Sequence, residues 1–245
     1  MTNKNILITG GNSRFCRFLK TELKSHKTFF TKKSQFNILK LNQMERYVKK
    51  KKINYLIHIA GLSRPMSIHD QNISKSIDLN IIGTANIVKL SKKFKFKLIY
   101  FSTNYVYPGT KGRYKENDPV LPVNNYAWSK LGGESSVRMY KNSLILRIAM
   151  TDYPFVHTKA IKGAYSSFIY NKTVSKILPY LINEKGILNI GGKRRDIFNF
   201  AKKFANSKIL PLNLNKVKNF PRDSSLNINK LMKILKKFKL KKVII

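Results

Sequence analysis

Short apolar runs alternate with amphipathic stretches along the first 149 residues of the chain. The runs are rich in Ile, Leu, Tyr and Phe, which is typical of strands buried in a parallel sheet. They predict strands at residues 5–9, 28–30, 54–61, 97–101 and 144–148. Apolar positions three and four apart between these runs predict helices. This alternation predicts an α/β fold with a doubly wound, Rossmann-like parallel sheet.

The pattern changes after residue 149. Residues 150–245 are less regular, with one short predicted strand within 186–192 and one amphipathic helix that begins near Ile228. We therefore expect two domains. Residues 1–149 form the Rossmann-like domain, and residues 150–245 form a small C-terminal region.

A glycine turn follows the first predicted strand and precedes a helix. A strand, a glycine turn and a helix in this order aim the N–H groups of the helix start at a pyrophosphate. The candidate cofactor-binding residues of this turn are Gly10, Asn12, Ser13, Arg14 and Phe15. The sequence therefore predicts a dinucleotide site at the turn.

The residues after the second predicted strand bear on the choice of cofactor. NAD enzymes commonly place an acidic residue there to bind the ribose 2′-hydroxyl, but Lys32 and Lys33 occupy these positions. Together with Arg14 they predict positive charge where a 2′-phosphate would bind. NADP(H) is therefore favoured over NAD(H), although lysine is common throughout the chain.

Polar side chains follow the predicted strand at 97–101. Because open α/β sheets hold ligands beyond the carboxyl ends of their strands, Ser102, Thr103 and Asn104 are candidate substrate-binding residues. Tyr126 and Lys130 open the next predicted helix and lie four residues apart, on one helix face. A free phenol titrates at about 10, and an adjacent ammonium makes it a stronger acid. The pair is therefore a candidate proton donor.

The Tyr-x-x-x-Lys spacing occurs three times in this lysine-rich chain. Tyr47 starts one copy inside a lysine run, and Tyr107 starts another that contains a Pro-Gly turn. The copy at Tyr126 differs because it opens a helix after a Ser-Thr strand end. We therefore take Thr103, Tyr126 and Lys130 as candidate catalytic residues, the alternative being an incidental surface helix start.

Three segments resemble the extended short-chain dehydrogenase/reductases. They are the Thr-Gly turn at 9–10, Ile-His-x-Ala-Gly at 57–61 and Asn-x-x-Gly-Thr at 80–84. The turn departs from the family's Thr-Gly-x-x-Gly-x-x-Gly, because Ser13 and Cys16 replace its second and third glycines.

The resemblance also implies roles for residues outside the turn. Residues 54–61 would form the fourth strand of the sheet and end in Ala60 and Gly61, whose small size leaves room for a cofactor. Asn80 is expected to be buried and hydrogen-bonded near the active site, a plain polar helix residue being the alternative. His58 is expected to pack inside the sheet rather than to take part in chemistry.

A closer resemblance, to the dTDP-4-dehydrorhamnose reductases, rests on three segments. They are Ser-Thr-x-Tyr-Val-Tyr-Pro-Gly at 102–109, the Tyr126 helix with its Gly-Glu pair, and Pro-Arg-x-Ser-x-Leu at 221–226. It implies an NAD(P)H-dependent reductase of a nucleotide-activated 4-keto-6-deoxy sugar, as used in dTDP-rhamnose and polysaccharide biosynthesis. By this resemblance Thr103 binds the substrate carbonyl, Tyr126 donates the proton, and Lys130 holds the cofactor ribose and tunes the tyrosine.

Two other functions stay open. An NAD-dependent nucleotide-sugar epimerase or dehydratase shares the fold, but a dehydratase needs an acid/base pair beside the tyrosine. Asn104 offers no carboxylate for that pair, since it stands where the reductases usually have Asp. A catalytically weak nucleotide-sugar-binding protein is the second alternative, because Ser13 and Cys16 interrupt the glycine turn.

Charge adds one further alternative. The chain has 49 Lys and Arg residues against 11 Asp and Glu residues, for a net charge of +38. Such an excess favours binding to nucleic-acid phosphates, yet most of these residues are lysines on predicted helix faces, and no nucleic-acid motif is visible. We therefore expect solvated lysine faces and no specific nucleic-acid site.

Arginine is scarcer than lysine in this chain. We expect Arg222 to contact the substrate diphosphate, because a guanidinium binds phosphate in a forked geometry.

The remaining composition predicts a cytoplasmic protein. No apolar run approaches the ~20 residues of a membrane span, and Cys16 is the one cysteine, so no intrachain disulfide is expected. The four histidines have no metal-ligand spacing with Cys16, so no metal-ligand residues are predicted, and metal dependence stays open. The expected partner is a nucleotide-sugar substrate, with homodimerisation left open.

Overall fold

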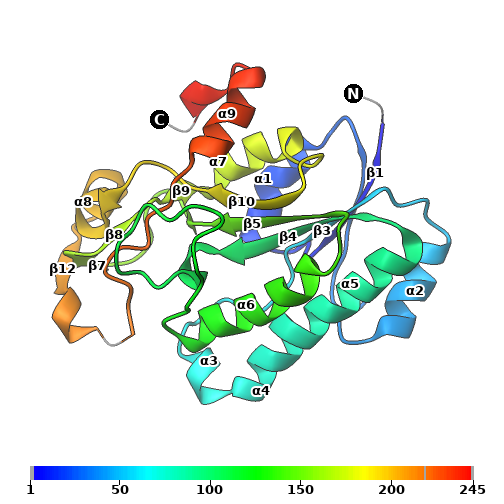
Figure 1. Ribbon diagram of the computed structural model, residues 1–245, viewed down its shortest axis with the longest axis horizontal. Coiled ribbons are helices and arrows are strands. Elements are labelled where there is room, and N and C mark those ends of the chain that lie inside the picture. Colours follow the sequence, from blue (N-terminus) through cyan, green and yellow to red (C-terminus); the bar gives the residue numbers. More distant parts are fainter. Residues whose placement is uncertain (1–2, 218, 244–245) are drawn as a thin grey trace. The chain divides into compact units, whose positions relative to one another are not determined.

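The computed structural model describes residues 3–217 and 219–243 of the 245-residue chain. Its central sheet has six strands in the order β10-β5-β4-β3-β1-β2, and the pairs β1–β2, β1–β3 and β3–β4 are parallel. The strands are β1 (Asn5–Thr9), β2 (Lys27–Phe30), β3 (Tyr55–His58), β4 (Lys97–Thr103), β5 (Ser143–Ile148) and β10 (Gly186–Ile190). The predicted α/β fold with a doubly wound parallel sheet is confirmed (Figure 1).

Helices lie on both faces of this sheet. They are α1 (Arg14–Glu22), α2 (Leu41–Lys49), α3 (Ile68–Gln71), α4 (Ile73–Ser76), α5 (Gly83–Phe94) and α6 (Asn125–Arg138). One apolar cluster joins Met44 of α2, Leu90 of α5 and Val137 of α6 to Leu98 of β4, so these three helices share a face (Figure 1). The Phe15 ring of α1 lies 5.2 Å from that of Phe101. Since side chains alternate along a strand, α1 covers the other face.

The strand order reverses at β1. The chain pairs β2 with one side of β1 and β3 with the other, and ligands of such sheets bind at this reversal, beyond the carboxyl ends of the strands. The expectation that residues 54–61 form the fourth strand is wrong. They contribute β3, which ends at His58, because β2 is the one strand that precedes it after β1 among the described residues.

The chain divides into two compact units. Unit 1 comprises Met1–Ser102, Trp128–Leu146 and Ile182–Ile187, and unit 2 comprises Thr103–Ala127, Arg147–Leu181 and Leu188–Ile245. Each unit draws on segments before and after residue 149, and the expected domain boundary there stays a prediction.

The later part of unit 2 contains short strands and α-helices. They are β6 (Met150–Thr151), β7 (Lys159–Lys162), β8 (Tyr165–Ser166), β9 (Ile169–Tyr170), α7 (Asn171–Ile177), β11 (Arg195–Asp196), α8 (Ile197–Phe204), β12 (Leu210–Asn213) and α9 (Asn229–Lys237). The pairs β6–β9 and β7–β12 are parallel, and β8–β11 is antiparallel. An apolar cluster that includes Ile161 of β7 and Phe200 of α8 forms its core. The strand predicted within 186–192 and the helix predicted near Ile228 are confirmed as β10 and α9.

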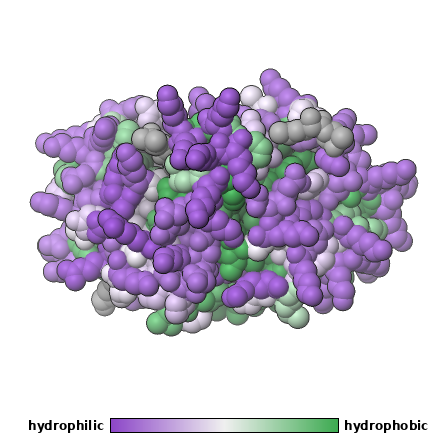
Figure 2. Space-filling view, turned by 45° about the horizontal axis from the view of Figure 1, so that its top comes forward, coloured by the Kyte–Doolittle hydropathy of each residue, from purple (hydrophilic) through white to green (hydrophobic). Residues whose placement is uncertain are grey.

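Lysine side chains lie mainly at the surface. On α9, Leu231, Ile234 and Leu235 are buried, whereas the lysines of the same helix are exposed. Figure 2 shows hydrophilic side chains over most of the face in view. Every helix in the described part of the chain is too short or too polar to cross a bilayer. Lys97 departs from this pattern, because it is only 7% exposed.

Candidate active site

The turn after β1 packs tightly against the ends of two neighbouring strands. Gly10 has a φ of +70°, and a Cβ on it would lie 3.0 Å from the backbone nitrogen of Ala60. A Cβ on Gly11 would lie 2.8 Å from the carbonyl carbon of Phe30. Both positions therefore require glycine, the first for its left-handed conformation as well as for space.

The two residues that replace family glycines have structural roles at the start of α1. Ser13 is the N-cap, and its Oγ accepts a hydrogen bond from the Cys16 backbone N–H at 3.4 Å. Cys16 is buried, and its Sγ donates to the Gly10 carbonyl at 3.5 Å. Burial raises the pKa of this thiol, which keeps it a donor. Because the first N–H groups of a helix lack helical partners, the turn retains the donors that a pyrophosphate needs.

The other predicted cofactor residues flank this turn. Asn12 and Arg14 are exposed, and Phe15 is buried. Lys32 and Lys33, which follow β2, are also exposed. Arg14, Lys32 and Lys33 therefore leave positive charge accessible in unit 1.

His58 lies inside the sheet, as expected. It is 1% exposed, with Nδ1 2.9 Å from Thr9 Oγ1 and Nε2 3.1 Å from Thr84 Oγ1. Burial, with a smaller effect of the Lys130 charge, lowers the pKa of His58 to about 3. The imidazole is therefore neutral near pH 7, and it fixes the end of β3 through its two threonine partners.

Asn80 lies on a π-helical turn, Ile77–Ile82, that precedes α5. Its Oδ1 accepts from the Leu62 N–H at 2.7 Å, and its Nδ2 donates to the Leu62 carbonyl at 2.9 Å and to Ser129 Oγ at 2.8 Å. Asn80 is 1% exposed, and a Cβ on Gly61 would lie 2.7 Å from its Oδ1. Asn80 thus ties the segment after β3 to α6. Isolated π turns are frequent at functional sites.

Lys130 is buried on α6, one helical turn after Tyr126. Its Nζ lies 4.3 Å from the centroid of the Tyr100 ring, and Tyr100 Oη donates to the Lys130 carbonyl at 3.1 Å. Burial lowers the pKa of Lys130 to about 7, whereas Glu134 raises it. Tyr126 is the second residue of α6 and is partly exposed. The helix start is fixed by Asn124, whose Oδ1 accepts from the Ala127 N–H at 2.9 Å.

The Ser102 hydroxyl is bound to a carboxylate within unit 1. Ser102 Oγ donates to Glu134 Oε2 at 2.7 Å, and Glu134 is fully buried. Next to Glu134, a Cβ on Gly133 would lie 2.4 Å from the Asn80 carbonyl oxygen and 2.7 Å from Tyr100 Oη. The Gly-Glu pair therefore lets α6 pack closely against the π turn and β4.

Thr103 and Asn104, the first residues of unit 2, are buried and hydrogen-bonded. Thr103 Oγ1 accepts from the Tyr105 N–H at 3.3 Å and donates to Asn104 Oδ1 at 3.4 Å. Asn104 Nδ2 donates to the Ser224 carbonyl at 3.1 Å. An ionised carboxylate has no donor for such a bond, so the amide at position 104 serves a role that Asp could not.

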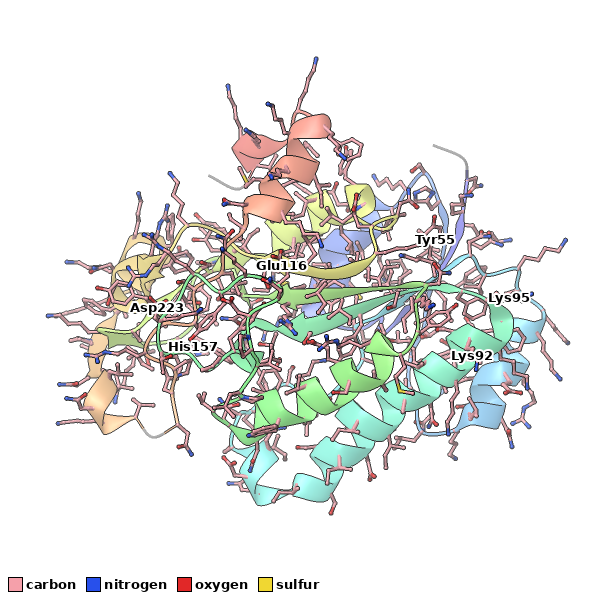
Figure 3. The ribbon with its side chains drawn as sticks, in the orientation of Figure 1. Tyr55, Lys92, Lys95, Glu116, His157 and Asp223 are labelled. Carbon is pink, nitrogen blue, oxygen red and sulfur yellow. The ribbon has the colours of Figure 1, made fainter. Side chains whose placement is uncertain are left out.

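Arg222 lies in the segment 221–226, where the backbone is held from several sides. Its carbonyl accepts from the Tyr165 N–H at 2.9 Å, while its side chain is exposed. The adjacent Asp223, labelled in Figure 3, is 4% exposed and binds Arg194 Nε at 2.7 Å. The Arg194 guanidinium stacks 3.7 Å from the Tyr165 ring centroid. The sequence analysis named Arg222 as a candidate, and that assignment stays a prediction. It did not consider Arg194, because Arg194 lies outside the segments that resemble the family.

The other two Tyr-x-x-x-Lys copies have different surroundings. Lys51 Nζ lies 3.9 Å from the Tyr47 ring centroid at the end of α2. Tyr107 is fully buried and accepts a hydrogen bond from Arg147 Nη1 at 2.8 Å. Tyr107 therefore belongs to the core of unit 2, and Tyr47 forms a cation–π pair in unit 1.

A family model, described as the RmlD substrate binding domain, matches residues 4–153. Among curated proteins, methionine adenosyltransferase 2 subunit beta of Pongo abelii is 28% identical over 144 residues, covering 55% of this chain and 43% of that protein. The dTDP-D-glucose 4,6-dehydratase of Dictyostelium discoideum is 30% identical over 165 residues, covering 61% of this chain and 36% of that protein. These matches span less than half of the length of either relative.

Several solved structures have the same fold. The dTDP-4-dehydrorhamnose reductase of Bacillus anthracis, in complex with NADP, has a TM-score of 0.83 at 21% identity and covers 94% of this chain and 91% of its own. That of Yersinia enterocolitica has a TM-score of 0.82 at 23% identity and covers 99% of both chains. The UDP-glucose 4-epimerase of Thermus thermophilus, in complex with NAD, has a TM-score of 0.78 at 15% identity and covers 94% and 92%.

Proposed function

Since the chain belongs to the family of the RmlD substrate binding domain, we propose that it is an NAD(P)H-dependent reductase of a nucleotide-activated 4-keto-6-deoxy sugar. The observation that carries the proposal is the placement of Lys130. Its ammonium is buried on α6, one turn after Tyr126, with its pKa lowered by burial to about 7. A buried cation that no carboxylate binds directly in the described residues fits a role in holding a ligand and tuning a neighbouring group.

The glycine turn fits the pyrophosphate of a nicotinamide dinucleotide. Gly10 and Gly11 hold the backbone close to β2 and β3, and Ser13 directs its hydroxyl to its own helix. Ala60, Gly61 and Asn80 would line the same edge of the sheet. Arg14 is exposed at the start of α1, and a contact between its guanidinium and a ribose 2′-phosphate would favour NADP(H) over NAD(H), although the fold also occurs with NAD.

The proposed chemistry combines proton donation and carbonyl binding. The bound reduced cofactor supplies hydride to the C4 carbonyl carbon of the sugar. The Tyr126 hydroxyl donates its proton to the carbonyl oxygen as negative charge develops there, and Lys130 stabilises the phenolate that remains. Thr103 orients the carbonyl, and Arg222 holds the diphosphate. The hydroxyl of Ser102 stays on Glu134 and supports β4 rather than the substrate.

Asn104 favours the reductase over a dehydratase of the same fold. Its amide is 3% exposed and donates to the Ser224 carbonyl. An amide has no titratable proton with which to act as the acid or base that elimination needs.

A dinucleotide-binding subunit without reductase activity is a second candidate. It is favoured by one observation, the match to proteins named as a subunit of methionine adenosyltransferase 2. Such a protein would bind the cofactor at the glycine turn without turning over a sugar substrate.

One assay separates these functions. The chain is incubated with NADPH and either dTDP- or UDP-4-keto-6-deoxyhexose, while the absorbance of the reduced cofactor and the sugar products are followed. The reductase consumes the cofactor in step with the sugar. An altered sugar without net consumption would identify an epimerase or dehydratase, and cofactor binding without either change would identify the subunit.

A further inference from the structure

A pocket lies within unit 1, at the edge of the sheet opposite to the glycine turn. It has a volume of about 380 Å³ and is lined by residues at or just before the first residues of β1, β3, β4 and β5. Because strands that run parallel begin at a common edge, this pocket is separate from the carboxyl edge where the cofactor is proposed. Figure 3 labels two of its residues, Tyr55 and Lys95.

The lining of this pocket is strongly basic. Among the described residues, its lining includes four lysines, namely Lys4, Lys95, Lys97 and Lys185, and no acidic residue. The charge of Glu184 acts on Lys97 from outside the lining, so the four ammonium groups are only partly compensated. A cavity with several like charges and low volume favours a small, multiply charged anion.

Lys97 is the most buried of these lysines. It is 7% exposed, and its Nζ donates to the Glu184 carbonyl at 2.6 Å. Among the described residues no second acceptor binds this ammonium, which has three N–H donors. The pKa of Lys97 is lowered to about 8, mainly by burial and also by the charge of Lys185, against the opposite effect of Glu184. A bound anion would accept from the other N–H donors of this ammonium and offset the cost of burying its charge.

The backbone at Lys95 is a second sign of a built site. Lys95 ends α5 in the left-handed conformation, with a φ of +57°. Glycine or asparagine is usual at this position of a helix, and strained residues gather at functional sites. Lys95 is also one of the residues that line the pocket.

Neutral donors complete the lining. Asn54 Oδ1 accepts from the Asn5 N–H at 2.9 Å, and Asn183 Oδ1 accepts from Tyr55 Oη at 2.6 Å. In the described part of the chain the NH₂ groups of Asn54 and Asn183 have no acceptor. These amides therefore add donors to the four ammonium groups.

We propose that this pocket binds a small soluble anion that carries two or more charges on phosphate groups, as pyrophosphate and phosphate monoesters do. Lysine binds phosphate as a point charge, and the cavity volume lies at the lower end of the range for small-ligand sites, about 300–1,000 Å³. The inference is independent of the proposed reductase activity.

Calorimetric titration with pyrophosphate and with glycerol 3-phosphate tests the proposal, using the full chain at about 150 mM salt, where loose surface binding is screened. We expect saturable binding at one site. Lys97→Met should weaken it about tenfold or more, as expected for losing a charged hydrogen bond. Lys95→Gly should also weaken binding, yet raise the Tm of the free protein because glycine suits the left-handed conformation. A purely structural role for Lys95 would not give these opposite signs.

Control variants distinguish binding in the pocket from non-specific attraction of the anion to this basic chain. Lys89→Met removes an exposed lysine on α5, outside the pocket, and should leave affinity within about twofold. The proposal is wrong if Lys89→Met weakens binding as much as Lys97→Met. It is equally wrong if Arg14→Gln abolishes binding, which would place the anion at the glycine turn, or if citrate binds as tightly as pyrophosphate.

Discussion

The ammonium of Lys130 lies 4.3 Å from the centre of the Tyr100 ring, and the Tyr100 hydroxyl donates to the Lys130 carbonyl at 3.1 Å. The Tyr100 side chain of β4 thus contacts both the side-chain ammonium and the backbone carbonyl of Lys130 on α6. The contact stabilises a buried cation through the face of the ring. It also fixes the position along β4 at which the lysine lies, close to the carboxyl edge of the sheet.

We predict that cofactor affinity falls as the pH rises through about 7. Burial lowers the pKa of Lys130 to about 7, so the ammonium predominates below that pH and the neutral amine above it. If binding requires the ammonium, the Kd of NADPH should rise about fivefold between pH 7 and pH 8. Fluorescence titration measures it. Lys130→Met should bind weakly with little dependence on pH in this range, whereas Lys89→Met should behave as wild type; an equal dependence in Lys130→Met would refute the assignment.

We predict that Gly133→Ala destabilises the protein. In a helix interior this change ordinarily stabilises by about 1 kcal/mol, but here the new Cβ would lie 2.4 Å from the Asn80 carbonyl oxygen. Overpacking of this kind costs about 1–3 kcal/mol. Urea denaturation should show the loss, while Ser135→Ala, an exposed change on the same helix, should be neutral or slightly stabilising. A stabilised Gly133→Ala variant would show that α6 does not pack this closely against the Asn80 carbonyl.

Acid stability should depend on His58. Burial lowers the pKa of His58 to about 3, so its contribution to stability is fully present above the unfolded pKa of about 6.5 and is lost as the pH falls below it. The free energy of unfolding should therefore fall by about 1.4 kcal/mol per pH unit between pH 6 and pH 4 on account of this group. His58→Gln should remove that slope, as measured by urea denaturation across this range. If the free energy of unfolding depends on pH equally in wild type and His58→Gln, then His58 is protonated in the folded state between pH 6 and pH 4.

Arg222→Lys should raise the KM for the nucleotide sugar and leave kcat nearly unchanged. The side chain is exposed on a backbone held by Tyr165, and lysine keeps the charge but loses the forked geometry. Loss of one charged hydrogen bond corresponds to about a tenfold rise in KM. Arg46→Lys, on α2, is the matched control. Steady-state kinetics with an unchanged KM for Arg222→Lys would remove Arg222 from the substrate site.

Much of unit 1 could be predicted from the sequence because its signals are local. The apolar runs predicted the strands, and the Ile-His segment placed His58 inside the sheet. The same local signals wrongly assigned residues 54–61 to the fourth strand instead of β3. Which strands join the sheet before it depends on tertiary pairing, which local patterns do not show. The π turn at Asn80 was missed because its residues have ordinary helical spacing.

The structural partners of the candidate residues were harder to predict. Glu134 binds Ser102 across 32 positions of sequence, and Ser224 accepts from Asn104 across 120. Neither pairing has a spacing that sequence periodicity reveals. The left-handed Lys95 was also unforeseen, because the signal for such a position is glycine or asparagine.

The most direct test of the account is the turnover of Tyr126→Phe beside that of Tyr47→Phe, each assayed with NADPH and the 4-keto sugar nucleotide. Tyr47 is the proper control because it also stands four residues before a lysine, whereas Tyr107 is bound to Arg147 in the core of unit 2. We predict that Tyr126→Phe lowers kcat by ~10²–10⁴, the usual loss for a general acid, with the Kd of NADPH nearly unchanged. Tyr47→Phe should retain wild-type turnover. A Tyr126→Phe variant that keeps more than about a tenth of wild-type kcat would contradict the proposed mechanism.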